Sequence, residues 1–271
     1  MIPKIIHYCW LSNNVIPENL QRCMDSWKEK LQDYEFVLWN FERFDINTSI
    51  WVKQAFEAKQ YAFAADFIRL YAVYHYGGIY LDMDIEIVKP FDNLLNSDIM
   101  VGCEDDNTND VEAGCFGAEK GHPFIGRCLN YYKEREFIMS DGCYDTLPLP
   151  QIMKNIYHED RTNNITFYPS DYFTAKSYKT GLIKVTPNTH SIHHFAGSWV
   201  SPSEAQKHHR VRRVYSIFGD NVISKFIIQC NEKMAMFKRM FVRFFYRLFV
   251  ELGPVGTFKH YFKRIIRKKA G

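Results

Sequence analysis

Several features are missing from this sequence of 271 residues, and each absence narrows the class of protein. No stretch of 18 or more predominantly apolar residues occurs, because Arg239, Arg243 and Arg247 interrupt even the Phe-rich C-terminal segment, so we expect no membrane-spanning helix. The N-terminus also lacks the basic region, the long apolar core and the small-residue cleavage site of a signal peptide. We therefore expect a cytoplasmic protein that contacts a membrane, if at all, only at its surface.

Paired cysteine motifs are absent as well. The 7 cysteines are widely scattered, form no Cys-x-x-Cys pair and show no metal-ligand spacing, so we expect reduced thiols, most of them buried. With 46% hydrophobic and 24% charged residues, 14 glycines and 10 prolines, the composition excludes disordered, collagen-like and low-complexity proteins. A folded globular protein is predicted.

The net charge of +3 conceals two blocks of opposite sign. Residues 1–206 hold 18 Lys and Arg against 28 Asp and Glu, whereas residues 207–271 hold 16 against 3. We interpret residues 1–206 as the catalytic domain and residues 207–271 as a basic, amphipathic helical C-terminal extension with a partner of its own.

The front block alternates between strand and helix patterns, which is typical of an α/β sheet. The hydrophobic spacing predicts strands at 5–10 and 34–39, helices at 17–31, 50–59 and 61–76, one strand at 79–88, a strand pair over 99–117 joined by the acidic loop 104–110, and helices at 123–136 and near 151–157. Strand and loop are expected over 162–200.

The most informative segment runs from the helix at 61–76 into the strand that follows Gly77 and Gly78. Asp66 and Arg69 are three residues apart, so they share a helix face. Asp82 and Asp84 are two apart, so we expect both to project from one side of the strand as it leaves the sheet. Two carboxylates there are hard oxygen ligands suited to Mg²⁺ or Mn²⁺, which substrate phosphates also bind.

An Asp-x-Asp motif by itself often arises by chance. Asp66 and Arg69 by themselves are typical of a local surface ion pair. A functional role for Asp82 and Asp84 is favoured by the order of the elements, in which a helix is followed by a Gly-Gly break and then by an apolar strand that ends in two acids. Two other classes stay open. A haloacid-dehalogenase-like phosphatase also uses Asp-x-Asp, although it normally has Thr or Val where this chain has Glu86, and a non-catalytic membrane-surface adaptor could be built around the basic extension.

The segments 65–69 and 76–84 resemble the sugar-binding DXD region of glycosyltransferase family 32, which includes bacterial capsule and lipopolysaccharide sugar transferases and fungal Golgi mannosyltransferases and is related to glucosylating toxins. Further similar segments are 2–7 with Trp10, 121–123, and 193–194 with 197–199, so the resemblance covers about residues 2–202. It implies a GT-A type nucleotide-sugar-binding fold, a Rossmann-like mixed sheet flanked by helices. The segment Leu11-Ser12-Asn13-Asn14 departs from the family's usual Gly-Gly after the first Trp.

The resemblance also implies a role for each matching residue on the donor side. Trp10 would stack on the uracil of a nucleotide sugar. Asp66 and Arg69 would hold the sugar and the diphosphate, and Tyr80, two residues before Asp82, would form a wall or offer a hydroxyl.

The same resemblance implies which residues would bind the metal and which would form a lid. Asp82 would contact ribose and metal, and Asp84 would ligate the metal directly; with Asp66 and Arg69 they form the expected catalytic set. His193, with His194 as the alternative, would approach the metal from the C-terminal side. Ser198 and Trp199 would belong to a lid over the diphosphate.

Together these roles imply a metal-dependent retaining transfer of a sugar, from a donor expected to be a UDP-sugar, to a hydroxyl of a glycan or lipid-linked oligosaccharide acceptor in bacterial surface polysaccharide synthesis. Double displacement needs a carboxylate nucleophile beneath the anomeric carbon, and the sequence offers no separate acid for it. We therefore favour attack on the same face, with the leaving phosphate accepting the proton and Mn²⁺ or Mg²⁺ stabilising the diphosphate.

The C-terminal extension predicts two or three helices, broken at Gly219 and at Gly253-Pro254. Arg239, Arg243 and Arg247 define one stripe of an otherwise apolar helix, and a second basic cluster lies within 259–269. We favour an anionic inner-membrane surface as the partner of residues 222–271 over nucleic acid, because a lipid-linked acceptor would place the enzyme there. The alternative is a helical cap on the core with a solvated basic end.

Overall fold

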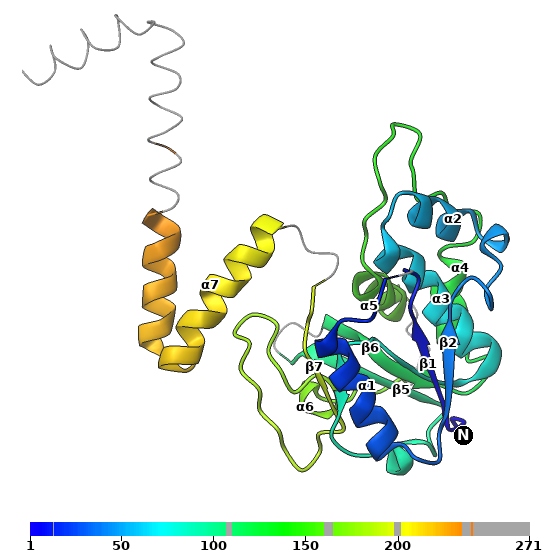
Figure 1. The fold of residues 1–271 in the computed structure, drawn as a ribbon, viewed down its shortest axis with the longest axis horizontal. Coiled ribbons are helices and arrows are strands. Elements are labelled where there is room, and N and C mark those ends of the chain that lie inside the picture. The colour runs from blue at the N-terminus through cyan, green and yellow to red at the C-terminus, as the bar shows by residue number, and fades with distance from the viewer. Residues whose placement is uncertain (13, 107–109, 160–164, 198–201, 235–239, 241–271) are drawn as a thin grey trace, which may run out of the picture. The chain divides into compact units, whose positions relative to one another are not determined.

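The computed structural model describes the chain except for residues 13, 107–109, 160–164, 198–201, 235–239 and 241–271 (Figure 1). The chain divides into two compact units, Met1–His208 and His209–Gly271. The first unit carries every candidate site residue named above, and the division lies close to the residue at which the charge changes sign.

The first unit is built on a five-stranded sheet with the order β2-β1-β3-β6-β5. Its strands are β1 (Ile5–Cys9), β2 (Glu35–Trp39), β3 (Gly78–Leu81), β5 (Ile99–Asp105) and β6 (Asp110–Ala118). β1 is parallel to β2 and β3, whereas β6 is antiparallel to both β3 and β5, so the sheet is mixed. The parallel pairs are joined through helices, as a parallel connection requires.

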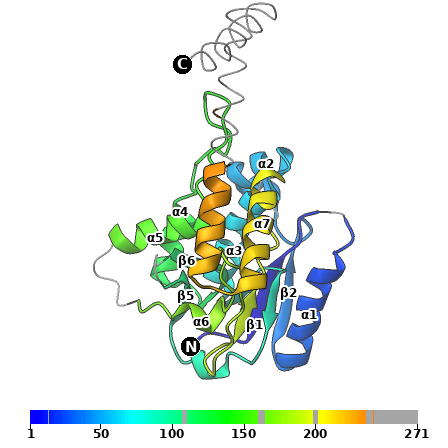
Figure 2. The same cartoon turned by 90° about the vertical axis from the view of Figure 1, so that its left-hand side faces the viewer.

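Hydrophobic residues alternate along the strands and supply a core on each face of the sheet. Tyr80 and Phe116 pack with one core, while Ile79 and Leu81 pack with the other. The first core is covered by α2 (Ile50–Glu57), α3 (Tyr61–Tyr76), α4 (Pro123–Asn130) and α5 (Leu149–Glu159), and the second by α1 (Glu18–Lys30), α6 (Ser170–Phe173) and a small antiparallel sheet of β4 (Ile85–Ile87) and β7 (Ser191–His193). Figure 2 shows α4 and α5 on the opposite side of the sheet from α1. Two 3-10 turns, Ile46–Thr48 and Asp92–Leu94, complete the elements.

The expected fold class, a mixed α/β sheet flanked by helices, is confirmed. The helix predicted at 61–76 coincides with α3, whereas the helix predicted at 123–136 ends at Asn130. The short helix α6 was not expected from the sequence.

The single strand predicted at 79–88 is wrong, because the chain turns at residues 82–84 and changes sheet there. β3 pairs in the main sheet, and β4 pairs with β7. The alternation of apolar residues continues through the turn, since Leu81, Met83 and Ile85 all lie in the second core. The hydrophobic pattern therefore contains no sign of the break.

The C-terminal residues that the structure describes are helical. α7 (Pro202–Phe218) begins before the predicted boundary, and residues 222–234 form a helix after a turn at Gly219, whose φ of 73° is in the left-handed region. The predicted break at Gly219 is confirmed; Gly253-Pro254, the stripe at 239, 243 and 247 and the cluster within 259–269 lie outside the described residues. Among the described helices, none has the length and apolar character needed to cross a bilayer.

Candidate active site

The glycines between α3 and β3 set the geometry of the site. Gly77 and Gly78 have φ of 72° and 103°, which lets the helix reverse directly into the strand. A side chain at Gly78 would stand 2.6 Å from the carbonyl oxygen of Ile5 on β1. The short connection therefore lays α3 against β3, with Asp66 and Arg69 of the helix above the end of the strand.

Arg69 links the helix to the strand end. Its Nη1 donates to Asp82 Oδ2 at 3.1 Å and to the carbonyl oxygen of Ala113 at 2.9 Å, and its Nη2 lies 3.3 Å from Asp66 Oδ1. The Tyr80 hydroxyl donates to Asp82 Oδ1 at 2.9 Å, and its ring lies 4.6 Å from the guanidinium. Asp82 is thus held from two sides by groups that neutralise or hydrogen-bond it.

Burial of this group changes the ionisation of Asp66. Desolvation raises its pKa to about 7, with the negative charge of Asp82 acting in the same direction and Arg69 opposing both. Burial likewise raises the pKa of Asp82 above its usual range, against the effect of Arg69.

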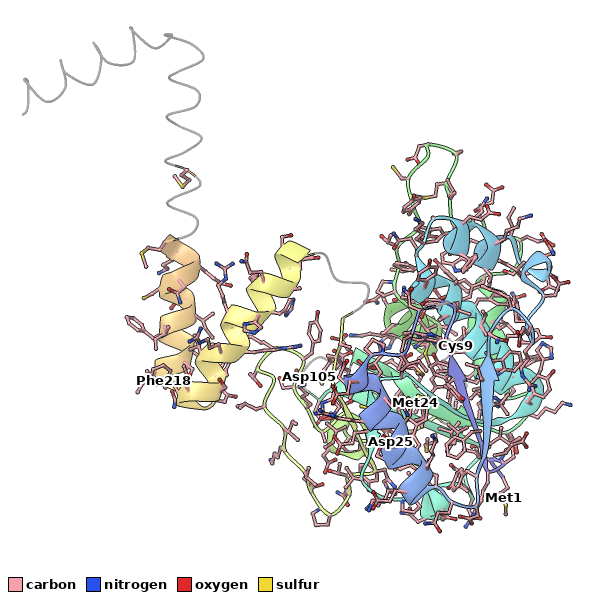
Figure 3. All side chains as sticks on the ribbon, in the orientation of Figure 1. Met1, Cys9, Met24, Asp25, Asp105 and Phe218 are labelled. Atoms are coloured by element: carbon pink, nitrogen blue, oxygen red, sulfur yellow. The ribbon has the colours of Figure 1, made fainter. Side chains whose placement is uncertain are left out.

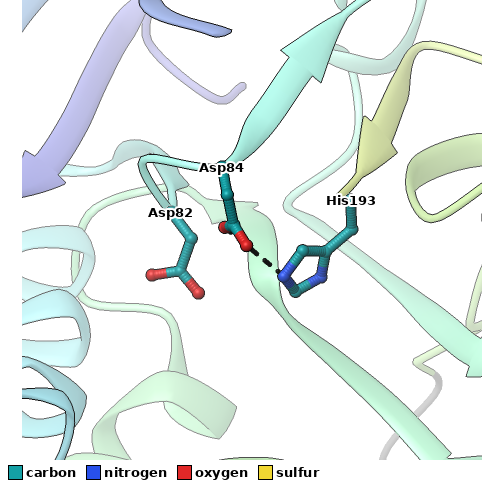
Figure 4. Close-up of side chains that lie close together, drawn as sticks. All are labelled: Asp82, Asp84 and His193. Carbon is teal, nitrogen blue, oxygen red and sulfur yellow. Dashed lines mark ion pairs between the residues drawn. The ribbon is translucent and has the colours of Figure 1, made fainter. Parts of the chain in front are cut away.

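The turn at residues 82–84 brings Asp84 close to the C-terminal end of β7. The amide of Asp82 donates to the carbonyl oxygen of Gly114 at 2.7 Å, and the amide of Ile85 donates to the carbonyl oxygen of Asp82 at 3.0 Å. These two hydrogen bonds fix the turn. Asp84 Oδ1 then lies 3.5 Å from His193 Nε2 (Figure 4). Asp82 and Asp84 therefore converge through a turn between sheets, and the expectation that they share one side of a continuous strand is wrong.

Asp84 is buried but remains suited to the ionised state. Although burial opposes ionisation, His193 and a 2.7 Å hydrogen bond from the amide of Ala196 hold the pKa of Asp84 well below its usual range. The chain reaches that hydrogen bond by adopting a left-handed φ of 54° at Phe195. Such a conformation in a bulky residue is costly and is concentrated at functional sites.

Asp82, Asp84 and His193 form a group whose ligand atoms all lie within 4.8 Å of one another. Two carboxylates suit Mn²⁺ or Mg²⁺, with the remaining positions left for water or phosphate oxygens, and the imidazole favours Mn²⁺ over the harder Mg²⁺. The donor set therefore fits the cation expected from the sequence.

The structure brings His193 to the two aspartates and keeps His194 away from them. His194 Nε2 lies 2.7 Å from Glu86 Oε2, and only its backbone amide approaches Asp84, at 3.0 Å from the carbonyl oxygen. His193 is the last residue of β7 and His194 is the next residue, and successive side chains along an extended chain face opposite sides, which explains the difference. The role of His193 as a ligand stays a prediction, with its geometry now favourable.

The remaining predicted residues are placed as follows. Tyr80 is 1% exposed, and its hydroxyl donates a hydrogen bond to Asp82. Trp10 is half-buried after β1, and its Nε1 donates to the carbonyl oxygen of Asn14 at 3.0 Å. Ser198 and Trp199 lie outside the described residues. Stacking by Trp10 and closure by the lid pair stay predictions.

Glu112 was missed by the sequence reasoning. It lies fully buried on β6, and its carboxylate accepts from His193 Nδ1 at 2.9 Å. The signal that marks it is an acid within the otherwise apolar or small run from Val111 to Ala118, which is hard to explain unless the charge has partners.

Comparison with known families gives a match within the N-terminal half of the chain. Residues 17–100 match the sequence model of the family described as "Glycosyltransferase sugar-binding region containing DXD motif". This range contains Asp66, Arg69, Asp82 and Asp84, and it confirms the resemblance inferred from them; Trp10 and His193 lie outside it.

Two curated relatives are fungal. Inositol phosphoceramide mannosyltransferase 3 of Schizosaccharomyces pombe is 34% identical over 128 residues, which is 46% of this chain and 35% of that protein. Mannosyl phosphorylinositol ceramide synthase CSH1 of Saccharomyces cerevisiae is 31% identical over 149 residues, 51% of this chain and 38% of that protein. The chain thus spans little more than a third of the length of these relatives, and they lend no support to a bacterial role.

Among solved structures, PaToxG glycosyltransferase is similar with a TM-score of 0.44 and 20% identity, over 58% of this chain and 69% of that one. The assignment of the fold as a mixed α/β sheet rests on the strand order of this structure and does not depend on that similarity.

Proposed function

We propose, from the premise that residues 17–100 match the glycosyltransferase sugar-binding region containing the DXD motif, that the protein is a metal-dependent retaining glycosyltransferase. Its donor is a nucleotide diphosphate sugar, with a UDP-sugar expected from the resemblance, and its acceptor is a hydroxyl of a glycan or lipid-linked molecule. The observation that carries the proposal is the convergence of Asp82, Asp84 and His193 beside the pair of Asp66 and Arg69.

Each group has a defined part in this reaction. Asp82, Asp84 and His193 would hold Mn²⁺ or Mg²⁺, which when bound supplies neutralisation of the charge on the leaving diphosphate. Asp66 would accept hydrogen bonds from sugar hydroxyls, and Arg69 would hold Asp82 in place and face phosphate oxygens.

The surroundings of Glu112 support transfer on the same face over double displacement. A nucleophile needs a carboxylate oxygen free to reach the sugar. Both oxygens of Glu112 are hydrogen-bonded and its side chain is 1% exposed, so it does not serve as one. The leaving phosphate is then the group that accepts the proton of the acceptor hydroxyl.

The names of the two fungal relatives support a lipid-linked acceptor, because both refer to transfer involving an inositol-containing ceramide. Because both names refer to a mannosyl group, we include GDP-mannose with the UDP-sugars as a candidate donor.

We further propose that the C-terminal portion holds the enzyme at an anionic membrane surface on the cytoplasmic face. Five exposed apolar residues surround the turn between α7 and the following helix, and they define a turn patch: Ile217, Phe218, Val222, Ile223 and Phe226. Figure 3 labels Phe218 at this turn. Residues 207–271 carry 16 basic against 3 acidic residues, a charge that complements anionic lipid.

A donor panel tests the proposed activity. Purified protein is incubated with UDP-glucose, UDP-galactose, their N-acetyl forms or GDP-mannose, with Mn²⁺ or with a chelator, and nucleotide release is measured. We expect release from one donor class, dependent on the metal and increased by an acceptor glycolipid. Phosphate release from simple phosphoesters without nucleotide release would instead support the phosphatase alternative, and vesicle binding without any turnover would support the adaptor.

A further inference from the structure

Glu112 is a charged side chain enclosed within the sheet, and every described contact of its carboxylate is to a donor. Oε1 accepts from the amide of Gly114 at 2.6 Å, and Oε2 accepts from Thr174 Oγ1 at 2.9 Å. His193 Nδ1 lies 3.1 Å from Oε1 and 2.9 Å from Oε2. A buried carboxylate is tolerated only with such a set of partners.

Two of these donors fix the carboxylate independently of the histidine. Gly114 belongs to the same strand, and Thr174 directly follows α6 at the edge of the second core. Glu112 is therefore held by the fold itself, and its remaining contact is directed at the imidazole.

The orientation of the imidazole follows from this contact. With Nδ1 held by Glu112, the nitrogen turned toward Asp84 is Nε2, at 3.5 Å from Oδ1. Phe195 stacks on the same ring with centroids 4.1 Å apart and an interplanar angle of 22°, which restricts its rotation. The ring thus has one position, with Nε2 facing the acids.

Gly114 makes room for this arrangement. A Cβ there would stand 2.9 Å from Glu112 Oε1 and from His193 Cε1, and 3.0 Å from Asp82 Oδ2. The glycine therefore lets three charged or polar side chains from β6, β7 and the turn approach one point.

We propose that Glu112 is a positioning residue that orients His193 Nε2 toward the cation held by Asp82 and Asp84. The inference rests on the proposed function for the presence of that cation, and it assigns Glu112 no contact with substrate. Carboxylates bonded to the outer nitrogen of a ligating histidine commonly fix its tautomer, and their loss lowers metal affinity about 10- to 100-fold.

The test compares Mn²⁺ binding, by titration calorimetry, in the full-length wild type and in Glu112→Gln and Glu112→Asp. Gln keeps the size and removes the charge and one acceptor oxygen, whereas Asp keeps the charge and withdraws it from the ring. We expect both to bind Mn²⁺ about 10- to 100-fold more weakly. Glu86→Gln, which removes the charge of the carboxylate paired with the neighbouring His194, is the matched control and is expected to bind as wild type.

A second readout is taken on the metal-free protein, so that it does not depend on activity. Nuclear magnetic resonance of labelled histidines, assigned with His193→Gln, is expected to show an Nδ1 proton protected by the bond to Glu112, and to lose this protection in Glu112→Asp, whose carboxylate no longer reaches the ring. Thermal melting confirms that each variant compared is folded.

The outcomes separate the inference from the proposed function. If the wild type fails to bind Mn²⁺, the proposed metal site and the inference are both overturned. If the wild type binds but a folded Glu112 variant binds within about twofold of it, only the inference is overturned, because loss of the carboxylate bonded to a ligating histidine should weaken binding by more than that. An unprotected Nδ1 proton in the wild type also overturns the inference.

Discussion

Arg69 donates to Asp82 across 3.1 Å while its other terminal nitrogen lies 3.3 Å from Asp66, so one guanidinium serves a buried and a partly buried carboxylate. Because Arg69 and Asp66 are buried and Asp82 is only partly exposed, one cation does not fully stabilise two anions. Asp66 shows the consequence, since desolvation, together with the charge of Asp82, raises its pKa to about 7 despite Arg69. With both acids ionised, these three side chains therefore carry one uncompensated negative charge, which a bound cation would balance.

Asp66→Asn is expected to stabilise the metal-free protein more at about pH 8 than at about pH 5. The folded pKa of Asp66 lies above that of an unfolded carboxyl, so the folded state holds the extra proton and loses stability as the pH rises through about 7. Asn has no proton to lose. Thermal melts in chelator at the two pH values should show the Tm difference from wild type growing by several degrees at the higher pH.

Asp25→Asn, which alters an exposed carboxylate on α1, is the control for this series and should follow the wild type at both pH values. A Tm difference for Asp66→Asn that does not change between the two pH values contradicts the assignment of Asp66 as a buried, proton-binding acid.

Gly114→Ala is expected to weaken Mn²⁺ binding by at least about tenfold, because its methyl group would displace the groups that meet at the site. The matched control is Gly117→Ala on the same strand, whose Cβ would stand 2.9 Å from the Gly78 carbonyl oxygen and from Ile79 Cγ1, away from the acids. Both variants should lose about 1–3 kcal/mol of stability through overpacking.

Calorimetric titration and thermal unfolding of this pair distinguish a local effect from a general one. Equal losses of Mn²⁺ affinity in the two variants would mean that the site responds only to strain in β6.

The turn patch is expected to mediate membrane binding. Ile223→Ser combined with Phe226→Ser leaves the charge unchanged and removes two exposed apolar side chains, which lie 58% and 64% exposed. Cosedimentation with vesicles that contain anionic lipid should fall by at least about tenfold, since each side chain contributes on the order of 1.5–3 kcal/mol when buried. Deleting residues 222–271 should abolish it.

Val15→Ser with Val185→Ser, which removes two exposed apolar side chains from the first unit, should leave vesicle binding intact. Unchanged membrane fractionation after deletion of 222–271 would rule out the lipid partner for this segment.

The sequence predicts the order of elements well wherever one local rule decides the structure. Helix α3 has uninterrupted apolar spacing and a glycine at its end, and both its bounds were predicted. The motif in 65–84 likewise predicts which side chains carry the chemistry, because a short chain segment holds them together through the reversal at Gly77 and Gly78.

What the sequence does not reveal depends on contacts between distant segments. The turn at 82–84 is invisible because Leu81, Met83 and Ile85 keep their alternation through it. Glu112 and His193 are 81 residues apart, and the pairing of β4 with β7, together with the bond from the His193 amide to the Thr174 carbonyl oxygen, brings the histidine to the acids. A single sequence contains no signal that joins these two residues.

The most direct test of the account is the metal dependence of nucleotide release in Asp84→Asn. Asn preserves the size of the side chain and an oxygen for the amide of Ala196, and it removes the charge that faces the cation. Glu86→Gln is the matched control, because Glu86 pairs with His194 outside the metal group. We predict that the wild type and Glu86→Gln release nucleotide with Mn²⁺ and not with chelator, while folded Asp84→Asn is slower on the order of 100-fold. Turnover by Asp84→Asn close to that of the wild type would contradict the central claim.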